Sequence, residues 1–291
     1  INGKNTNDVF NYQVTAAGVE KINLVDSDTE SNTVTLVSPF RQVDITGGKQ
    51  GNTYTVDNVS AATVNAADYL GDLRIQAVGG AKADIDQTIT LGKGDDIVTF
   101  TGTGRLTSGD KVVGGEGHDI VRGVLDANTK LNITGVEELH LASTNSINLD
   151  LGAGAADVKK LVFVSDESTA QTDRILNNAV AQQLTNTAGA IQQINRITID
   201  SSNIAELNFF GDFNTVDPTQ TAPNPAGTAF THTFNGVRLL NNEPEVVDVN
   251  INAALDYVAT TDAAAAYNLG QISINGKTET INVKVADDAK T

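Results

Sequence analysis

Residues 88–100 read TITLGKGDDIVTF, two short runs of apolar and β-branched residues joined by a turn. In each run apolar side chains alternate with polar ones, which is the period of a β-strand. The residues between the runs, GKGDD at 92–96, are types that favour tight turns. This stretch therefore predicts a strand, a glycine- and aspartate-rich turn and a second strand.

The same pattern extends over most of the chain. Short alternating runs, each ended by Gly, Asn, Asp or Ser, lie at 33–37, 43–46, 54–56, 62–65, 73–78, 88–91 and 96–100, and again at 196–200, 206–210, 245–251, 271–274 and 280–285. Strands spaced about 8–12 residues apart are typical of a sandwich, a barrel or a solenoid. Aromatic residues make up only 5% of the chain, which favours a solenoid with a narrow interior of small side chains. We predict an all-β fold, a β-solenoid resembling a parallel β-helix.

Two segments depart from the strand pattern. Residues 166–195 carry apolar side chains at helical spacing after acidic residues, which predicts a short helical insertion. Residues 212–231 hold three of the five prolines and are expected to form an exposed loop. We expect a solenoid at 1–165, the insertion at 166–195 and further β-rungs at 196–291. A second short helix is expected at 262–267.

Composition and charge exclude several classes of protein. Acidic residues number 36 and basic residues 19, which gives a formal net charge of −17. This excess disfavours binding to nucleic acid, whose phosphates require Lys and Arg, and indicates cations as partners. The chain has no Cys, so it has neither disulfides nor thiolate sites. No run approaches the ~20 apolar residues of a membrane span, so no membrane insertion is expected.

The chain also contains no Met and begins Ile1-Asn2-Gly3. No charged segment followed by an apolar one marks an export signal near residue 1. We therefore expect the sequence to be an excised part of a longer secreted chain.

The most informative turn is GGEGHDIVR at Gly114–Arg122. It matches the nonapeptide G-G-x-G-x-D-x-U-x at every specified position, with Val121 as the large apolar residue U. Its glycines permit a tight turn, and Asp119 adds a carboxylate. Because Ca²⁺ takes six to eight oxygen ligands from carboxylates and carbonyls, the turn predicts a calcium site.

A second copy, LGKGDDIVT, begins 23 residues upstream, with Leu91 in place of the first glycine. An uninterrupted array would repeat about every nine residues, or every eighteen for a full coil, so we expect an extra strand and turn between the copies. Asp110 lies in that gap and is expected to complete the coordination of the downstream turn. The alternative is that both turns are ordinary glycine-aspartate turns of a solenoid.

This motif pair, Gly109-Asp110 ahead of the second turn, and the run Gly135-Val136-Glu137-Glu138-Leu139 resemble the RTX-type, calcium-binding S-layer proteins of Gram-negative bacteria. They are also similar to adhesins that leave the cell by the same type I route. The resemblance implies a secreted, cysteine-free solenoid that needs Ca²⁺ to fold and that forms a lattice on the cell surface. It implies a calcium site made of Gly92, Gly94, Asp96, Asp110, Gly115, Gly117 and Asp119.

Catalytic motifs are missing from the sequence. His118, His140 and His232 lie far apart, and we expect exposed positions for them. No G-x-S-x-G, H-E-x-x-H or P-loop motif is present, so we do not expect an enzyme.

We expect an extracellular surface-layer component that assembles with copies of itself, with cell-surface polysaccharide as a further candidate partner. Two other functions stay open. One is a calcium-stabilised adhesin module whose loop at 212–231 binds a host or glycan surface. The other, ranked below it, is a β-helical carbohydrate-active enzyme.

Overall fold

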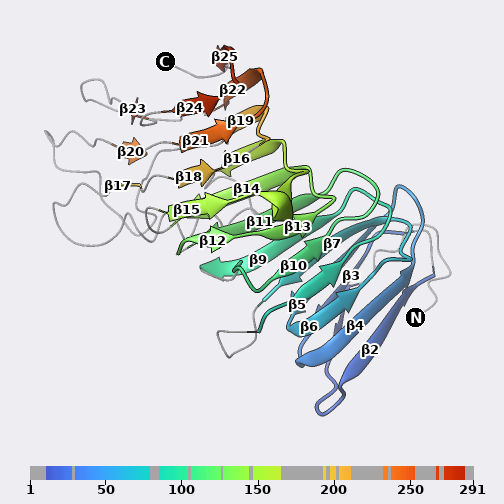
Figure 1. Cartoon of the computed structure of the whole chain (residues 1–291). Coiled ribbons are helices and arrows are strands. Elements are labelled where there is room, and N and C mark those ends of the chain that lie inside the picture. Colours follow the sequence, from blue (N-terminus) through green and yellow to red (C-terminus); the bar gives the residue numbers. More distant parts are fainter. Residues whose placement is uncertain are drawn as a thin grey trace, which may run out of the picture. The chain divides into compact units, whose positions relative to one another are not determined.

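The computed structural model describes residues 11–27, 30–78, 85–103, 106–125, 127–143, 147–164, 193–194, 197–200, 203–210, 232–234, 237–252, 267–268 and 272–285. These residues form strands connected by turns, with one 3-10 turn, η1 (Ala153–Ala155). The strands pair in parallel and build a parallel β-solenoid (Figure 1). The predicted fold class is confirmed at this level. No helix in the described residues is long and apolar enough to cross a membrane.

The chain divides into two compact units. The first comprises residues 1–123, 130–139 and 153–158, and the second comprises residues 124–129, 140–152 and 159–291. Two strands, β11 (Ile120–Leu125) and β14 (Glu138–Ser143), contribute residues to both units. The strand β12 (Thr129–Lys130) also spans the division.

The first unit contains two parallel sheets. One runs in the order β1 (Asn11–Val14), β3 (Asn32–Leu36), β5 (Thr53–Val59), β7 (Asp72–Ala77) and β9 (Ile97–Thr103). The other runs in the order β13 (Asn132–Thr134), β10 (Lys111–Val113), β8 (Thr88–Thr90), β6 (Ala61–Asn65), β4 (Phe40–Gly47) and β2 (Lys21–Asp26). Consecutive strands alternate between the two sheets, so each pair of strands makes one coil of the solenoid.

The length of a coil explains the spacing of the two motif copies. In the early coils, stacked positions such as Leu36 and Asn58 lie 22 residues apart. At the motif, stacked positions such as Leu73 and Asp96 lie 23 residues apart. The motif copies are therefore one coil apart, and β10 is the extra strand that was predicted between them.

The core of the first unit consists of columns of inward side chains. One column passes through Val34, Val56, Ile75 and Val98, and the other through Val43, Val64, Ile89, Val112 and Ile133. Every one of these side chains is at most 1% exposed. Because each coil places a β-branched residue directly on that of the next, these two columns contain no aromatic ring. Elsewhere the core includes three fully buried aromatic side chains, Tyr54, Tyr69 and Phe100.

The second unit repeats this plan. One sheet contains β16 (Lys160–Val164), β19 (Glu206–Phe210), β22 (Val246–Asn252) and β25 (Thr280–Val285), in that order. A second contains β15 (Ile147–Asp150), β18 (Ile197–Asp200), β21 (Val237–Asn242) and β24 (Ser273–Gly276). Three short strands, β17 (Gln193–Ile194), β20 (His232–Phe234) and β23 (Tyr267–Asn268), form a third sheet.

Where the structure describes residues of the two predicted helical segments, these residues form strands. Gln193 and Ile194, expected within the insertion at 166–195, form β17 and pair with β20. Tyr267, expected in a short helix, belongs to β23. At these positions hydrogen bonding to a neighbouring coil overrides the helical spacing of the sequence. The rest of 166–195, the loop at 212–231 and residues 262–266 lie outside the described residues.

A truncation in a core column should weaken the first unit strongly. Ile89 is 0% exposed, so Ile89→Ala should lower the free energy of unfolding by about 2–5 kcal/mol. Equilibrium unfolding in urea measures the change. Val25→Ala is the matched control, because Val25 is 66% exposed and its truncation should have little effect. Equal losses in the two variants would contradict the assigned core.

Candidate functional site

The two motif turns lie on successive coils of the first unit. The upstream turn, residues 92–96, joins β8 to β9, and the downstream turn, residues 114–119, joins β10 to β11. The Glu116 amide donates to the Gly92 carbonyl at 3.0 Å, and the Ile120 amide donates to the Asp96 carbonyl at 2.9 Å. The structure therefore brings together six of the predicted residues: Gly92, Gly94, Asp96, Gly115, Gly117 and Asp119.

The glycines of these turns allow the backbones of neighbouring coils to approach closely. A Cβ atom on Gly117 would lie 2.2 Å from the Gly94 carbonyl oxygen, and one on Gly94 would lie 2.1 Å from that of Gly71. Gly115 is likewise too close to Gly92 for a side chain. Gly115 and Gly117 also have positive φ angles, +111° and +124°, which side chains disfavour. The glycines of the motif are thus required for coil stacking.

The aspartates of the turns bind backbone amides of neighbouring positions. Asp96 Oδ1 accepts a hydrogen bond from the Leu73 amide at 2.7 Å, and its Oδ2 accepts one from the Gly92 amide at 3.1 Å. One coil later, Asp119 Oδ1 accepts from the Asp96 amide at 3.0 Å. Asp96 and Asp119 are both 0% exposed. Together they form a buried carboxylate ladder that links successive coils.

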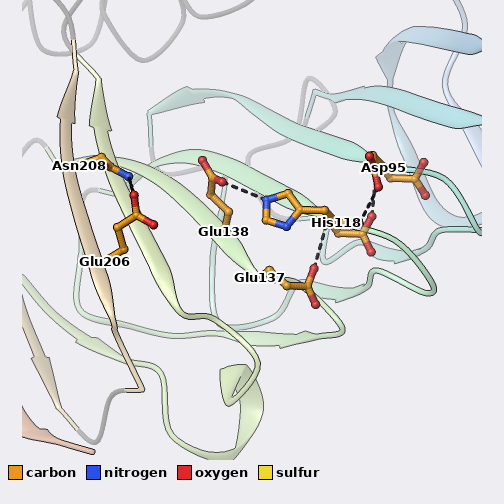
Figure 2. Close-up of polar contacts among 8 residues, drawn as sticks. Asp95, His118, Glu137, Glu138, Glu206 and Asn208 are labelled. Carbon is orange, nitrogen blue, oxygen red and sulfur yellow. Dashed lines mark hydrogen bonds and ion pairs between the residues drawn. The ribbon is translucent and has the colours of Figure 1, made fainter. Parts of the chain in front are cut away.

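A second ladder runs along the exposed side of the same turns. Asp72 accepts from the Asp95 amide at 3.0 Å, and Asp95 accepts from the His118 amide at 2.8 Å. Figure 2 shows Asp95, Glu137 and Glu138 gathered around His118, whose ring nitrogen Nε2 lies 3.1 Å from Glu138 Oε2.

The next turn supplies the carboxylate that follows Asp119 in this series, from a side chain that is only partly buried. Glu137 Oε2 accepts from the Asp119 amide at 2.9 Å. Glu137 comes from the Gly135–Leu139 run, so a glutamate takes the place that aspartates hold in the two motif turns.

Asp110 lies apart from the stacked turns. It precedes β10, whereas the turn at 114–119 follows that strand. Its Oδ1 accepts from the Gln87 amide at 2.8 Å, and its Oδ2 accepts from the Thr107 amide at 2.8 Å and the Thr107 hydroxyl at 3.0 Å. Asp110 therefore performs the same coil-linking task at the other end of the strand, and the structure does not bring it to Asp119.

The histidines occupy different environments. The His118 side chain is half exposed, as expected. The prediction that His140 is exposed is wrong, because His140 is only 8% exposed. Its neighbours Leu139 and Leu141 are buried too, so β14 is covered on both faces at this point. The side chain of His232 lies outside the described residues.

Some oxygens of the turns are arranged as ligands of a hard cation, and others are already engaged in hydrogen bonds. Both oxygens of Asp96 and both of Asp110 already accept hydrogen bonds, whereas Asp119 Oδ2 is buried with no hydrogen-bond partner. A Cβ atom on Gly114 would lie 2.3 Å from Asp119 Oδ2 and 1.8 Å from the Gly135 carbonyl oxygen, so these two oxygens converge beside Gly114. Carboxylate and carbonyl oxygens are the ligands that Ca²⁺ prefers. In the described part of the chain, no three His, Cys, Asp or Glu side chains gather as a metal cluster.

Gly114 and Gly135 are the residues that the predicted metal set leaves out. Gly114 is the first glycine of the complete nonapeptide, and the upstream copy has Leu91 at that place. This difference in sequence could have indicated that the Gly135 carbonyl oxygen approaches the downstream turn, because a side chain at position 114 would block it.

Burial raises the pKa values of the two buried aspartates, Asp96 and Asp119. Desolvation raises the pKa of Asp96 to about 7, against the hydrogen bonds from the Leu73 and Gly92 amides, which lower it. Desolvation likewise raises the pKa of Asp119 to about 7, and the nearby Asp96 and Glu137 carboxylates add to the effect. The anionic ladder is therefore unfavourable at neutral pH unless a cation or a proton compensates it.

Comparisons with known proteins identify no relative of this chain: no protein-family model, curated protein or solved structure matches it. The function is therefore inferred from the geometry above.

Replacing a stacking glycine should cost more than replacing a glycine of positive φ in open space. Gly117→Ala brings a methyl group onto the Gly94 carbonyl, whereas Gly18, with φ +79°, has nothing within 4 Å of its Cβ position. Gly18→Ala should cost about 1–2 kcal/mol from backbone strain alone, and Gly117→Ala clearly more. Urea unfolding compares the two variants. Equal losses would show that the close approach of the coils is unimportant.

Stability without divalent cations should fall as pH rises from about 4 to about 7. The folded chain keeps protons on Asp96 and Asp119 up to about pH 7, whereas unfolded aspartates lose theirs near 3.8. Over that range the folded state binds more protons, so the rise in pH favours unfolding. Asp119→Asn should flatten the dependence, because its amide oxygen still accepts from the Asp96 amide.

Urea midpoints at several pH values, in a chelator, test this expectation. Asp96→Asn is the contrasting variant, because its side-chain NH₂ would face a backbone N–H of Leu73 or Gly92. It should be destabilised even at low pH. Identical pH profiles for the parent chain and Asp119→Asn would contradict the assignment.

Proposed function

We propose that this chain is a calcium-stabilised structural segment of a bacterial surface layer, whose solenoid assembles outside the cell with copies of itself. The observation that carries the proposal is the buried, unpaired oxygen Asp119 Oδ2 beside the Gly135 carbonyl, within stacked turns of the nonapeptide type. A buried carboxylate oxygen that lacks a donor costs free energy, and a bound cation recovers it.

Asp119 and the Gly135 carbonyl are the residues that would hold the ion. Asp96 and Asp110 have both oxygens engaged by amides, so they support the fold around the site. The bound ion supplies positive charge next to a buried anion. The carbonyls of Gly92, Gly94, Gly115 and Gly117 are the further ligands that the resemblance implies.

Because the chain is strongly negative, its folding would depend on the Ca²⁺ concentration, which differs between the inside and the outside of the cell. A net charge of −17 and anionic buried aspartates oppose compaction where Ca²⁺ is scarce. A ligand that binds only the folded state adds RT ln(1 + [L]/Kd), about 2.7 kcal/mol at a hundredfold excess over Kd. Calcium outside the cell would then drive folding after export, which suits a chain without disulfides.

The buried carboxylates also favour a structural role over a catalytic one. The oxygens of Asp96 and Asp110 accept from backbone amides of the turns, which is a fold-stabilising use of a carboxylate. The adhesin alternative depends on the loop at 212–231, which lies outside the described residues, so no observation favours it.

Calcium dependence of the fold is the test. Far-UV circular dichroism and thermal melting, with Ca²⁺ and with a chelator, should show a more stable strand signal with Ca²⁺. Calorimetric titration should detect binding, and electron microscopy should show ordered sheets only with Ca²⁺. Asp119→Asn should lose the thermal shift. A strand signal and melting temperature unaffected by the chelator, with no binding, would overturn the proposal.

Asp57→Asn is the matched control for the calcium response. Asp57 also has a buried carboxylate oxygen without a hydrogen-bond partner, and its pKa is raised by desolvation, but it lies on β5 away from the motif turns. This variant should keep the full thermal shift with Ca²⁺. Loss of the shift in both variants would mean that the response is not specific to Asp119.

A further inference from the structure

The backbone at Gly135 departs from the hydrogen-bond pattern of the coils before it. In the sheet that contains β2 and β13, the amide after a strand donates to the carbonyl of the last residue of the next strand. Three such bonds, each 2.8 Å long, join Ala66 to Thr90, Leu91 to Val113 and Gly114 to Thr134. Gly135 follows β13, which ends this sheet among the described strands. No described strand of the sheet therefore offers a carbonyl to the Gly135 amide.

The side chain of Asp157 takes the place of that carbonyl. Asp157 Oδ2 accepts a hydrogen bond from the Gly135 amide at 2.8 Å. Asp157 follows η1 and lies 22 residues after Gly135, which places it on the next coil. A carboxylate of one turn thus satisfies the backbone amide that a strand satisfies in the earlier coils.

The turn that carries Asp157 is fixed by its neighbours. Ala155 and Val158 are 2% and 1% exposed, and the Val158 amide donates to the Ala155 carbonyl at 3.3 Å. A Cβ atom on Gly154 would lie 2.4 Å from the Leu131 carbonyl oxygen, so the turn packs closely against the coil that carries Gly135. The side chain of Asp157 is exposed, but its backbone is anchored between buried residues.

The bond to Asp157 orients the peptide group between Thr134 and Gly135. The Thr134 carbonyl accepts from the Gly114 amide at 2.8 Å, and the Gly135 amide donates to Asp157. The carbonyl and the amide are opposite sides of one planar peptide, so this group is held from the coil before and the coil after. The left-handed φ of Gly135, +62°, then directs the chain onward from a fixed plane.

This fixed segment contains the carbonyl that lies beside Asp119 Oδ2, that of Gly135. Its far side is anchored as well, because the Glu137 and Glu138 amides each donate to the Asp119 carbonyl at 3.2 Å. We propose that Asp157 is a positioning residue of the cation site, which holds the Gly135 peptide so that the Gly135 carbonyl and Asp119 Oδ2 converge on the ion. A bound ion would then link the turns at 114–119, 135–137 and 153–157.

This inference rests on the proposed function, because it gives Asp157 a task at the proposed calcium site. Asp157 lies outside the nonapeptide and two turns after Asp119, and it does not contact the ion in this arrangement. Removing a group that orients a metal ligand through a hydrogen bond typically weakens metal binding about 10- to 100-fold. Asp157 should act at that level.

Calorimetric titration of the full chain with Ca²⁺ tests the role. Asp157→Ala removes the acceptor of the Gly135 amide and should weaken Ca²⁺ binding about 10- to 100-fold. Asp157→Asn keeps an oxygen that accepts from this amide and loses only an exposed charge, so it should bind within about fivefold of the parent chain. Because Asp157 is exposed, both variants should stay folded, which circular dichroism checks.

Asp72→Ala is the matched control for a general loss of stability. Asp72 also accepts a turn amide of the next coil, that of Asp95 at 3.0 Å, but two coils before Gly135. In urea unfolding with chelator, Asp72→Ala and Asp157→Ala should lose similar stability. Only Asp157→Ala should lose affinity for Ca²⁺. Equal loss of affinity in the two variants would show that weaker coil stacking, and not the position of Gly135, is the cause.

NMR of the Gly135 amide tests the hydrogen bond in the absence of calcium. In protein labelled with nitrogen-15 and kept in chelator, Asp157→Ala should move the Gly135 amide proton upfield and speed its exchange with solvent. Asp157→Asn should change both much less. A Gly135 amide that does not respond to Asp157→Ala would overturn the positioning role.

The outcomes separate this inference from the proposed function. If folded Asp157→Ala binds Ca²⁺ as tightly as the parent chain, the positioning role is wrong and the calcium site stands. Equal weakening in Asp157→Asn and Asp157→Ala would also overturn the role, because the negative charge would then be the cause. A parent chain that binds no Ca²⁺ would overturn the proposed function itself, and the task of Asp157 with it.

Discussion

The hydrogen bond that a backbone amide of one coil donates to a turn carboxylate of the next is the interaction on which the rest of the first unit depends. A parallel solenoid satisfies the amides of its strands through the sheets, but each turn leaves amides that no strand partner reaches. Asp96, Asp119 and Glu137 meet this need on successive coils. The close approach that these bonds require is possible because glycines occupy the facing positions.

The same arrangement carries an electrostatic cost. Asp96 and Asp119 lie buried on neighbouring coils, and burial opposes the ionisation of both carboxyl groups. Backbone amides compensate part of this cost, and all the oxygens of Asp96 and Asp110 are compensated in this way. In Asp119, on the coil that carries the complete nonapeptide, Oδ2 accepts no such hydrogen bond. The structural use of the motif is therefore compatible with the cation site that we propose, because Asp119 Oδ2 is not engaged by a backbone amide.

The sequence predicted the strands and the solenoid well, because alternation and glycine-aspartate turns report local backbone geometry. Six of the seven residues predicted to bind calcium lie together in the stacked turns, because the motif copies are one coil apart. The sequence did not predict that Asp110 would lie at the other end of β10, because the three residues between Asp110 and the turn, 111–113, are too short a run to be recognised as a strand that separates them. The partner of Asp119, the Gly135 carbonyl, comes from the following turn, and only the stacking of coils brings it near. The prediction that His140 is exposed failed because strand alternation assumes that one face of the strand is exposed to solvent. At His140 both faces of β14 are buried.

The central claim is that Asp119 is a buried carboxyl group whose spare oxygen accepts a cation. Carbon-13 NMR of aspartate-labelled protein, with the Asp119 signal assigned by its loss in Asp119→Asn, follows this group directly. In chelator its pKa should lie near the value of about 7 that burial imposes, and added Ca²⁺ should lower it sharply. A pKa near the ordinary value of 3.8 in chelator, or one that Ca²⁺ leaves unchanged, would contradict the account.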